Sequence, residues 1–223
     1  MSAGGLIVKG TLAVRAQPTA ARIGAIILAG GRGSRMGGDI PKPLRMLAGR
    51  PLIAHVLDRL ADLDPVVINA QDDGTFDAFG DGVAPDLRPG FEGPLAGIEA
   101  GLAWHAHDAE EDAASHVIVV PSDTPFLPQT LKDRLLAEAT PTEIVVARHG
   151  GRLHPTVALW PVALLSTLSQ WLDDERPRAL RAFLDHAGYR TVPFGDGTDA
   201  APDDPFFNIN TLDDLSRAED RFG

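Results

Sequence analysis

The chain has 223 residues, of which 44% are hydrophobic and 23% are charged, and these proportions exclude a disordered chain and a coiled coil. It contains no cysteine, which excludes disulfides, cysteine-ligated metal sites and a thiol nucleophile. The formal net charge of −11 argues against general nucleic-acid binding, and no apolar run approaches the roughly 18 residues that a membrane-spanning helix needs.

The charge is distributed unevenly along the chain. Residues 1–38 contain five basic side chains and no acidic one. Such a basic end suits a small anionic ligand, although a merely basic tail would look the same. Residues 1–22 lack the apolar core of a signal peptide, so we expect a flexible N-terminal extension before a single domain at 23–223, located in the cytoplasm.

From residue 23 onward, strand-like and helix-like segments alternate. Short continuous apolar runs predict buried strands at 23–28, 66–69 and 117–120, and further strands are expected near Val83, at 144–146 and at 156–160. Helical spacing of apolar residues predicts helices at 52–63, after Pro94, around 131–136, at 162–172, at 178–186 and from Leu212 onward.

This alternation predicts an α/β protein with a mainly parallel central sheet. Ligands of such sheets bind beyond the carboxyl ends of the strands. The rule marks three places in this chain, which follow Leu28, Asn69 and Val120.

The segment 29–42, directly after the first predicted strand, is rich in glycine. It fails the dinucleotide-binding fingerprint, because Met36 stands where a third Gly or Ala is needed, and it fails the P-loop pattern, because Asp39 stands in place of Lys. Its glycines would still let backbone N–H groups approach phosphate oxygens, and Arg35 and Lys42 could supply positive charge. An ordinary solvated loop would have the same composition.

Five elements of the sequence, in order, resemble the nucleotidyltransferases of the molybdenum cofactor guanylyltransferase type. The first is the L-A-G-G-x-x-x-R-M-G-G pattern that begins at Leu28. The others are Gly93–Gly97, Pro121–Phe126, His154–Thr156 and Phe207–Thr211, which resemble the family's GPLAG, PCDTPF, HPT and F-N-x-N-T elements. The resemblance extends from Ile23 to about Phe222 and implies a three-layer, Rossmann-like nucleotidyltransferase fold.

The resemblance also implies a reaction. The terminal phosphate of molybdenum-bound molybdopterin would attack the α-phosphorus of GTP, giving molybdopterin guanine dinucleotide and pyrophosphate. Magnesium would be the cofactor, and molybdoenzyme maturation proteins would be candidate partners. Such a displacement depends on positioning and charge neutralisation rather than on a covalent enzyme intermediate.

The expected site residues fall into three groups. Arg35, Lys42 and Asp123 would be catalytic, and Asp123 would also hold the metal, because one carboxylate together with phosphate oxygens commonly binds Mg²⁺. The resemblance further implies nucleotide contacts from Leu28, Ala29, Gly30, Lys42, Asn69, Asp86 and Asp123. Acceptor contacts are expected from His154, Asn208 and Asn210, whereas His105, His107 and His116 are interpreted as surface residues.

One departure from the family pattern concerns the end of the glycine-rich loop. The family usually has Asp-Lys-Gly there, but this chain has Pro41-Lys42-Pro43, which looks more like sugar-1-phosphate nucleotidyltransferases. A molybdopterin cytidylyltransferase and a catalytically silent nucleotide-binding regulator are also compatible with the sequence. The L-A-G-G start resembles the guanylyl members, and free carbonyl groups of Leu28 or Ala29 would accept from guanine N1–H and N2–H₂.

Overall fold

A computed structural model describes residues 22–30, 40–90, 93–107, 114–174, 176–195 and 204–222. The predictions for the N-terminal extension and for Arg35 in the glycine-rich loop therefore lie outside the described residues.

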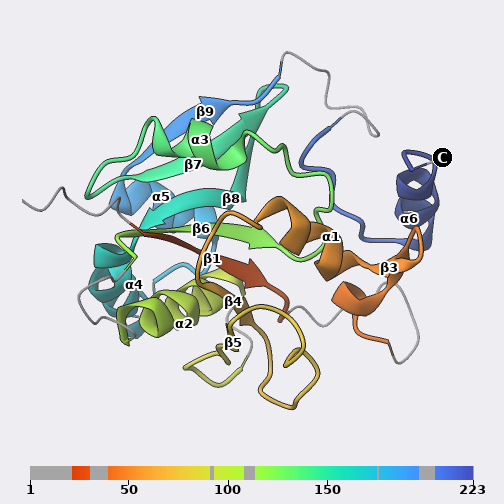
Figure 1. Cartoon of the computed structure of the whole chain (residues 1–223). Coiled ribbons are helices and arrows are strands. Elements are labelled where there is room, and N and C mark those ends of the chain that lie inside the picture. The colour runs from red at the N-terminus through yellow and green to blue at the C-terminus, as the bar shows by residue number, and fades with distance from the viewer. Residues whose placement is uncertain are drawn as a thin grey trace, which may run out of the picture.

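The described residues form a seven-stranded central sheet with the strand order β5-β4-β1-β6-β8-β7-β9 (Figure 1). Only β8 runs antiparallel to its neighbours there, which confirms the mainly parallel sheet. The strands are β1 Ile23–Leu28, β4 Val66–Asn69, β5 Gly82–Val83, β6 His116–Pro121, β7 Ile144–His149, β8 Arg152–Pro161 and β9 Tyr189–Pro193. A separate hairpin consists of β2 Met46–Leu47 and β3 Arg50–Pro51.

Helices cover both faces of the sheet and produce the three layers expected from the sequence (Figure 1). On one face lie α1 Leu52–Arg59 and α3 Leu131–Leu136, and on the other lie α2 Pro94–His107, α4 Leu165–Asp173 and α5 Leu180–Ala187. The last helix, α6 Leu212–Glu219, lies with the β2–β3 hairpin at the end of the molecule toward which β1 points. Short 3-10 helices at Lys42–Leu44 and Val162–Leu164 complete the elements.

The central strand β1 is continuously apolar because both of its faces are buried. Ala25 and Ile27 belong to the apolar cluster beneath α1 and α3, whereas Ile26 between them belongs to the cluster beneath α2 and α4. All three side chains are fully buried, and each buried Ile stabilises the fold by about 1.5–3 kcal/mol. Gly101 lets α2 pack closely here, because a Cβ at this position would come within 2.5 Å of the Ile26 side chain.

Three features differ from the sequence prediction. The edge strand β9 is missed, since most of its residues are exposed and carry no apolar pattern. The β2–β3 hairpin is missed as well, because its strands have only two residues each. The interpretation of His105 as a surface residue is wrong: it is buried, and its ring lies against Gly24 with Nε2 3.1 Å from the Ala25 carbonyl oxygen.

None of the helices in the described ranges is both long and apolar enough to cross a lipid bilayer.

Candidate active site

The carboxyl ends of β1, β4 and β6 lie side by side. Leu28 at the end of β1 is in register with Asn69 on β4 and with Pro121 on β6. The segments that follow these strands therefore meet at one edge of the sheet, as the sequence predicts. β1 divides this edge into a β6 side and a β4 side, and the two sides are built differently.

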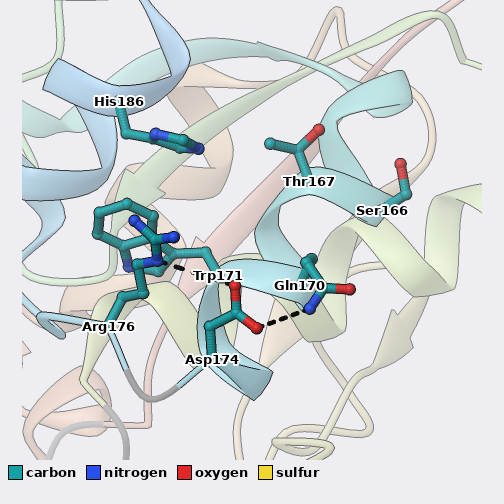
Figure 2. Close-up of a pocket in the computed structure, with 7 residues that line it drawn as sticks. All are labelled: Ser166, Thr167, Gln170, Trp171, Asp174, Arg176 and His186. Carbon is teal, nitrogen blue, oxygen red and sulfur yellow. Dashed lines mark hydrogen bonds and ion pairs between the residues drawn. The ribbon is translucent and has the colours of Figure 1, made fainter.

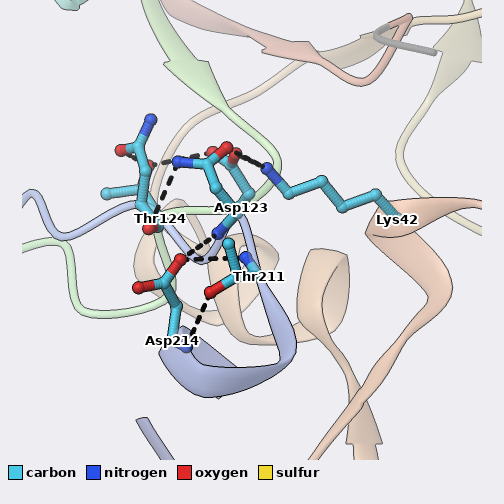
Figure 3. A network of polar contacts seen from close by, with 7 residues as sticks. Lys42, Asp123, Thr124, Thr211 and Asp214 are labelled. Atoms are coloured by element: carbon cyan, nitrogen blue, oxygen red, sulfur yellow. Dashed lines mark hydrogen bonds and ion pairs between the residues drawn. The ribbon is translucent and has the colours of Figure 1, made fainter. Parts of the chain in front are cut away.

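On the β6 side, Lys42, Asp123 and Asn210 form a polar cluster. Figure 3 shows the Lys42 side chain pointing toward Asp123. The Lys42 ammonium donates to Asp123 Oδ2 and, over 2.7 Å, to Asn210 Oδ1. The side chains of Lys42 and Asp123 are only 14% and 12% exposed, so their attraction is screened less than that of a surface pair. The structure thus brings together three predicted site residues that are far apart in the sequence.

The segment 204–210, which we call the strap, fixes this cluster from the C-terminal end of the chain. The Ile209 N–H donates to the Asp123 carbonyl oxygen over 3.0 Å, and Thr124 Oγ1 donates to Asn208 Oδ1 over the same distance. Asn208 therefore contacts Thr124, which follows Asp123 in the sequence. Asn210 contacts Lys42, which is the ion-pair partner of the Asp123 carboxylate.

A capping box at the start of α6 holds the end of the strap. The Asp214 carboxylate accepts from the backbone N–H groups of Asn210 and Thr211 at 3.0 and 2.9 Å, and Thr211 Oγ1 accepts from the Asp214 N–H at 3.0 Å (Figure 3). Reciprocal bonds of this kind stabilise the first turn of a helix. These bonds hold the Asn210 backbone in place, and its side chain can therefore contact Lys42.

The strap also connects the predicted acceptor residue His154 to this side of the edge. The imidazole of His154 on β8 packs against the Phe206 ring, with 4.6 Å between ring centroids. Phe206 belongs to the same segment as Asn208 and Asn210, and it is buried. The strap is therefore in contact with both His154 and the residues around Asp123.

On the β4 side, Asn69 and Asp86 form the second group of predicted residues. Asn69 is buried, and its Nδ2 donates to Asp86 Oδ1 over 2.9 Å and to the Ala84 carbonyl oxygen over 3.0 Å. Asn69 Oδ1 lies against Gly97 of α2, where an added Cβ would come within 2.1 Å of it. Only a glycine leaves room for the amide, which gives a physical reason for the second Gly of the GPLAG element.

The carbonyl groups at the end of β1 are not equivalent. The Leu28 carbonyl accepts the Ser122 N–H over 3.0 Å. Among the described residues, no hydrogen bond reaches the Ala29 carbonyl, whereas the Ala29 N–H donates to Asn69 O over 2.9 Å. Ala29 is thus the better placed of the two to accept from a base, and Gly30 lies next to Asn69.

Several residues of the site were missed by the sequence analysis. Thr124 and Asp214 support the β6 side, as described above. On the β4 side Arg88 forms a bidentate ion pair with Glu99, whose side chain is 2% exposed. Hydrogen bonds to Glu99 and then to Asp173 raise the pKa of Arg88 above its ordinary value. The single acidic residue of α2, in a mostly apolar stretch, was the available signal for Glu99.

The residues around Asp123 fit a magnesium ion by their chemistry. A carboxylate with two amide oxygens near it is a hard oxygen donor set, and Mg²⁺ is usually held by one or two carboxylates together with substrate phosphates. No cluster of three or more acidic or histidine side chains suited to a metal occurs in the described part of the chain. A metal here would therefore depend on Asp123 and on oxygen atoms from a bound substrate.

Hollows elsewhere on the surface involve other residues. One of about 310 Å³ lies between α4 and α5 (Figure 2). Another of about 460 Å³ lies between the segment after β5 and α2. None of the site residues predicted from the sequence lines either of them. Those predicted residues that the structure describes gather at the carboxyl edge of the sheet instead.

Comparison with known proteins identifies the family. Residues 25–189 match the MobA-like NTP transferase domain. The chain belongs to the MobA-like NTP transferase family. It is therefore a nucleotidyltransferase, in agreement with the motifs and with the cluster around Asp123.

Individual relatives agree with this assignment. A molybdenum cofactor guanylyltransferase of Bradyrhizobium sp. (strain ORS 278) is 44% identical over 205 residues, which cover 90% of this transferase and 93% of the relative. One of Rhizobium meliloti (strain 1021) is 45% identical and covers 87% and 89%. The crystal structure of molybdopterin-guanine dinucleotide biosynthesis protein A from Archaeoglobus fulgidus shares the fold, with a TM-score of 0.67, 24% identity, and coverage of 90% and 98%.

Proposed function

We propose that this transferase moves GMP from GTP to the terminal phosphate of molybdenum-bound molybdopterin, and that it releases pyrophosphate. The observation that carries the proposal is the Lys42–Asp123–Asn210 cluster at the carboxyl edge of the sheet, which joins a cation, a carboxylate and an amide from three motifs. The guanylyltransferase relatives, which are similar along nearly the whole chain, support the choice of GTP and molybdopterin.

The two sides of the edge take different substrates in this proposal. Asn69, Asp86, Ala29 and Gly30 on the β4 side bind the nucleoside, and the backbone of Leu28 adjoins them. His154, Asn208 and Asn210 on the β6 side bind the molybdopterin phosphate. Lys42 and Asp123 lie where the triphosphate would meet the acceptor.

Lys42 supplies positive charge to the phosphates, and Arg35 adds a second cation from the glycine-rich loop. Asp123 would hold a magnesium ion, which would supply Lewis-acid neutralisation of the phosphate charge when bound. In this chain Asn210 and Asp123 together hold the Lys42 ammonium in one position, so little reorganisation is needed when negative charge develops. The acceptor phosphate is itself the nucleophile, and no enzyme side chain has to form a bond to the nucleotide.

Base choice rests on the Ala29 carbonyl. Guanine presents two neighbouring donors, N1–H and N2–H₂, whereas cytosine lacks that donor pair. A buried acceptor that loses its partner costs about 1–3 kcal/mol, which favours GTP over CTP by roughly 5- to 150-fold. We also propose that the protein works in the cytoplasm and hands its product to molybdoenzyme maturation proteins.

The Pro41-Lys42-Pro43 sequence supports a second candidate, a sugar-1-phosphate nucleotidyltransferase. The two prolines flank the lysine at a short 3-10 helix, and Pro43 is buried. They fix the backbone that presents Lys42, which restricts the loop but leaves the lysine charge unchanged. We therefore regard the prolines as shaping this loop without changing the acceptor.

Ligand-induced stabilisation tests nucleotide binding. The melting temperature would be measured with GTP, CTP, UTP and ATP, each with and without magnesium. A nucleotide at 100 times its dissociation constant stabilises the folded state by about 2.7 kcal/mol. We expect GTP with magnesium to give the largest increase in melting temperature, and an absence of stabilisation by every nucleotide would contradict the proposal.

A further inference from the structure

The segment that carries Asp86 leaves β5 and returns to α2 with little apolar packing. Pro85 and Leu87 on either side of Asp86 are exposed, and Leu87 is 61% exposed. Gly90 has a φ of 103°, a conformation that favours glycine. The position of Asp86 therefore depends on polar contacts more than on burial.

Arg88, two residues beyond Asp86, fastens this segment to α2. Its Nε donates to Glu99 Oε2 over 2.8 Å and its Nη2 donates to Glu99 Oε1 over 2.9 Å, a bidentate geometry that only a guanidinium provides. Since the Glu99 side chain is almost fully buried, this carboxylate needs a charged partner.

Arg88 also reaches α4. Its Nη1 donates to Asp173 Oδ1 over 2.7 Å, and its Nη2 donates to the Ser169 carbonyl oxygen over 3.2 Å. Two helices thus hold one side chain of the Asp86 segment. Asp174, the next residue after Asp173, points elsewhere: it accepts from Gln170 over 2.8 Å and lines the hollow between α4 and α5 (Figure 2).

The contacts of Arg88, Glu99, Asp86 and Asn69 form a ring, which the backbone closes between Asp86 and Arg88 and between Gly97 and Glu99. Glu99 holds Arg88, Asp86 accepts from Asn69, and Asn69 Oδ1 lies against Gly97, which is two residues before Glu99 on α2. Without the Arg88 side chain, the segment would lose its polar contacts with both α2 and α4, and Asp86 would keep its hydrogen bond from Asn69. The ring therefore couples the Arg88 side chain to the placement of both predicted nucleotide contacts.

We propose that Arg88, through Glu99, is a positioning residue that places Asp86 and Asn69 for the nucleoside and thereby sets the affinity for GTP. The inference rests on the proposed function. Arg88 acts through Asp86 and does not itself touch the reacting phosphates, so it affects nucleotide binding rather than the transfer step.

The experiment compares four variants with the parent: Arg88→Met, Arg88→Lys, the double variant Arg88→Met with Glu99→Met, and Asp174→Asn as the matched control on α4. For each we would measure the dissociation constant of GTP by direct titration, KM and kcat with molybdopterin as acceptor, and the melting temperature. The double variant removes the buried unpaired carboxylate, so it separates folding stability from positioning.

We expect Arg88→Met to raise the dissociation constant and KM for GTP about tenfold while kcat stays within about twofold, because the loosened segment must be ordered when the nucleotide binds. Arg88→Lys should recover part of this affinity, and Asp174→Asn should behave like the parent. The double variant should regain the melting temperature of the parent but not its affinity for GTP.

Two results would overturn the inference alone. One is an Arg88→Met variant that binds GTP as well as the parent while its melting temperature falls. The other is a double variant that regains both stability and affinity, because the loss would then come from the unpaired Glu99. A parent protein that binds no nucleotide would overturn the proposed function and the inference together.

Discussion

Both sides of the carboxyl edge are polar, but their residues come together from different distances along the sequence. On the β4 side, Asn69, Asp86, Arg88 and Glu99 all come from one stretch of about 30 residues, and the contacts that join them span fewer than 20 positions. On the β6 side, Lys42 meets Asp123 across 81 positions and Asn210 across 168. The contacts among these four nucleoside-side residues are thus local in sequence, although Arg88 also reaches Asp173 across 85 positions. The cluster on the phosphate side is assembled entirely from distant parts of the chain.

The difference has a physical consequence. A local group of contacts can adjust through small shifts of one segment, so single changes should alter affinity by moderate factors. The assembled side depends on a few charged groups whose attraction is strong because they are shielded from water. Changes there should affect the transfer step itself, and the largest effects are expected at Asp123.

Asp123→Asn should produce the largest loss. Removing the carboxylate of the cluster takes away the expected metal ligand and the partner of Lys42, while the isosteric amide preserves the fold. We expect turnover to fall by roughly 10²–10³-fold, the usual cost of one electrostatic contact in an active site. Pyrophosphate release at limiting magnesium measures it, with the exposed Asp62→Asn as control. Turnover within a few-fold of the parent would contradict the assignment.

Lys42→Ala should be the next largest effect, with a loss of about 100-fold in kcat/KM for GTP. The double change Pro41→Asp with Pro43→Gly should retain most activity, because the prolines shape the loop but carry no charge. Steady-state kinetics on both variants distinguishes charge from loop shape. An active Lys42→Ala together with an inactive double variant would reverse the roles that we propose.

Gly97→Ala tests the nucleoside side. The added Cβ would overlap Asn69 Oδ1, so either the amide or α2 must move, at a cost of about 1–3 kcal/mol. We expect weaker GTP binding and a lower melting temperature. In an Asn69→Ala background the same Gly97→Ala change should cost little, since its main clash is gone. Equal destabilisation in both backgrounds would show that the contact with Asn69 is not the cause.

Asp214→Ala should have the smallest effect. It removes the capping box that fastens the Asn210 backbone, which costs about 1 kcal/mol of stability and lowers turnover by a few-fold. Asp213→Ala is the matched control, because Asp213 lies in the same turn but pairs with the exposed Arg217. Chemical denaturation and kinetics on both variants check this. A similar effect of the two changes would argue that the capping box does not position Asn210.

The contrast between local and long-range contacts also explains which features could be predicted from the sequence. The strands β1, β4 and β6 could be predicted because both faces are buried, and buried strands need continuous apolar runs. β9 could not be predicted, because an edge strand with exposed side chains has no such pattern. In the site, the resemblance identified Lys42 and Asp123, but their contact could not be predicted from spacing.

Two further features also could not be predicted from the sequence. The burial of His105 depends on the space above Gly24, a tertiary contact that helical periodicity does not show. The Leu28 carbonyl is taken by the Ser122 N–H, which follows from how β1 and β6 end and not from either sequence segment alone. The first feature depends on how α2 packs on β1, and the second depends on the register between β1 and β6.

Pyrophosphate release with molybdenum-bound molybdopterin as acceptor, measured with GTP, CTP and ATP in turn, tests the central claim most directly. We predict release with GTP roughly 5- to 150-fold faster than with CTP or ATP, because only guanine offers the donor pair that the Ala29 carbonyl would meet, and a lost partner costs about 1–3 kcal/mol. A sugar-1-phosphate in place of molybdopterin should support no release. Equal rates with CTP and GTP, or release only with the sugar phosphate, would contradict guanylyl transfer to molybdopterin.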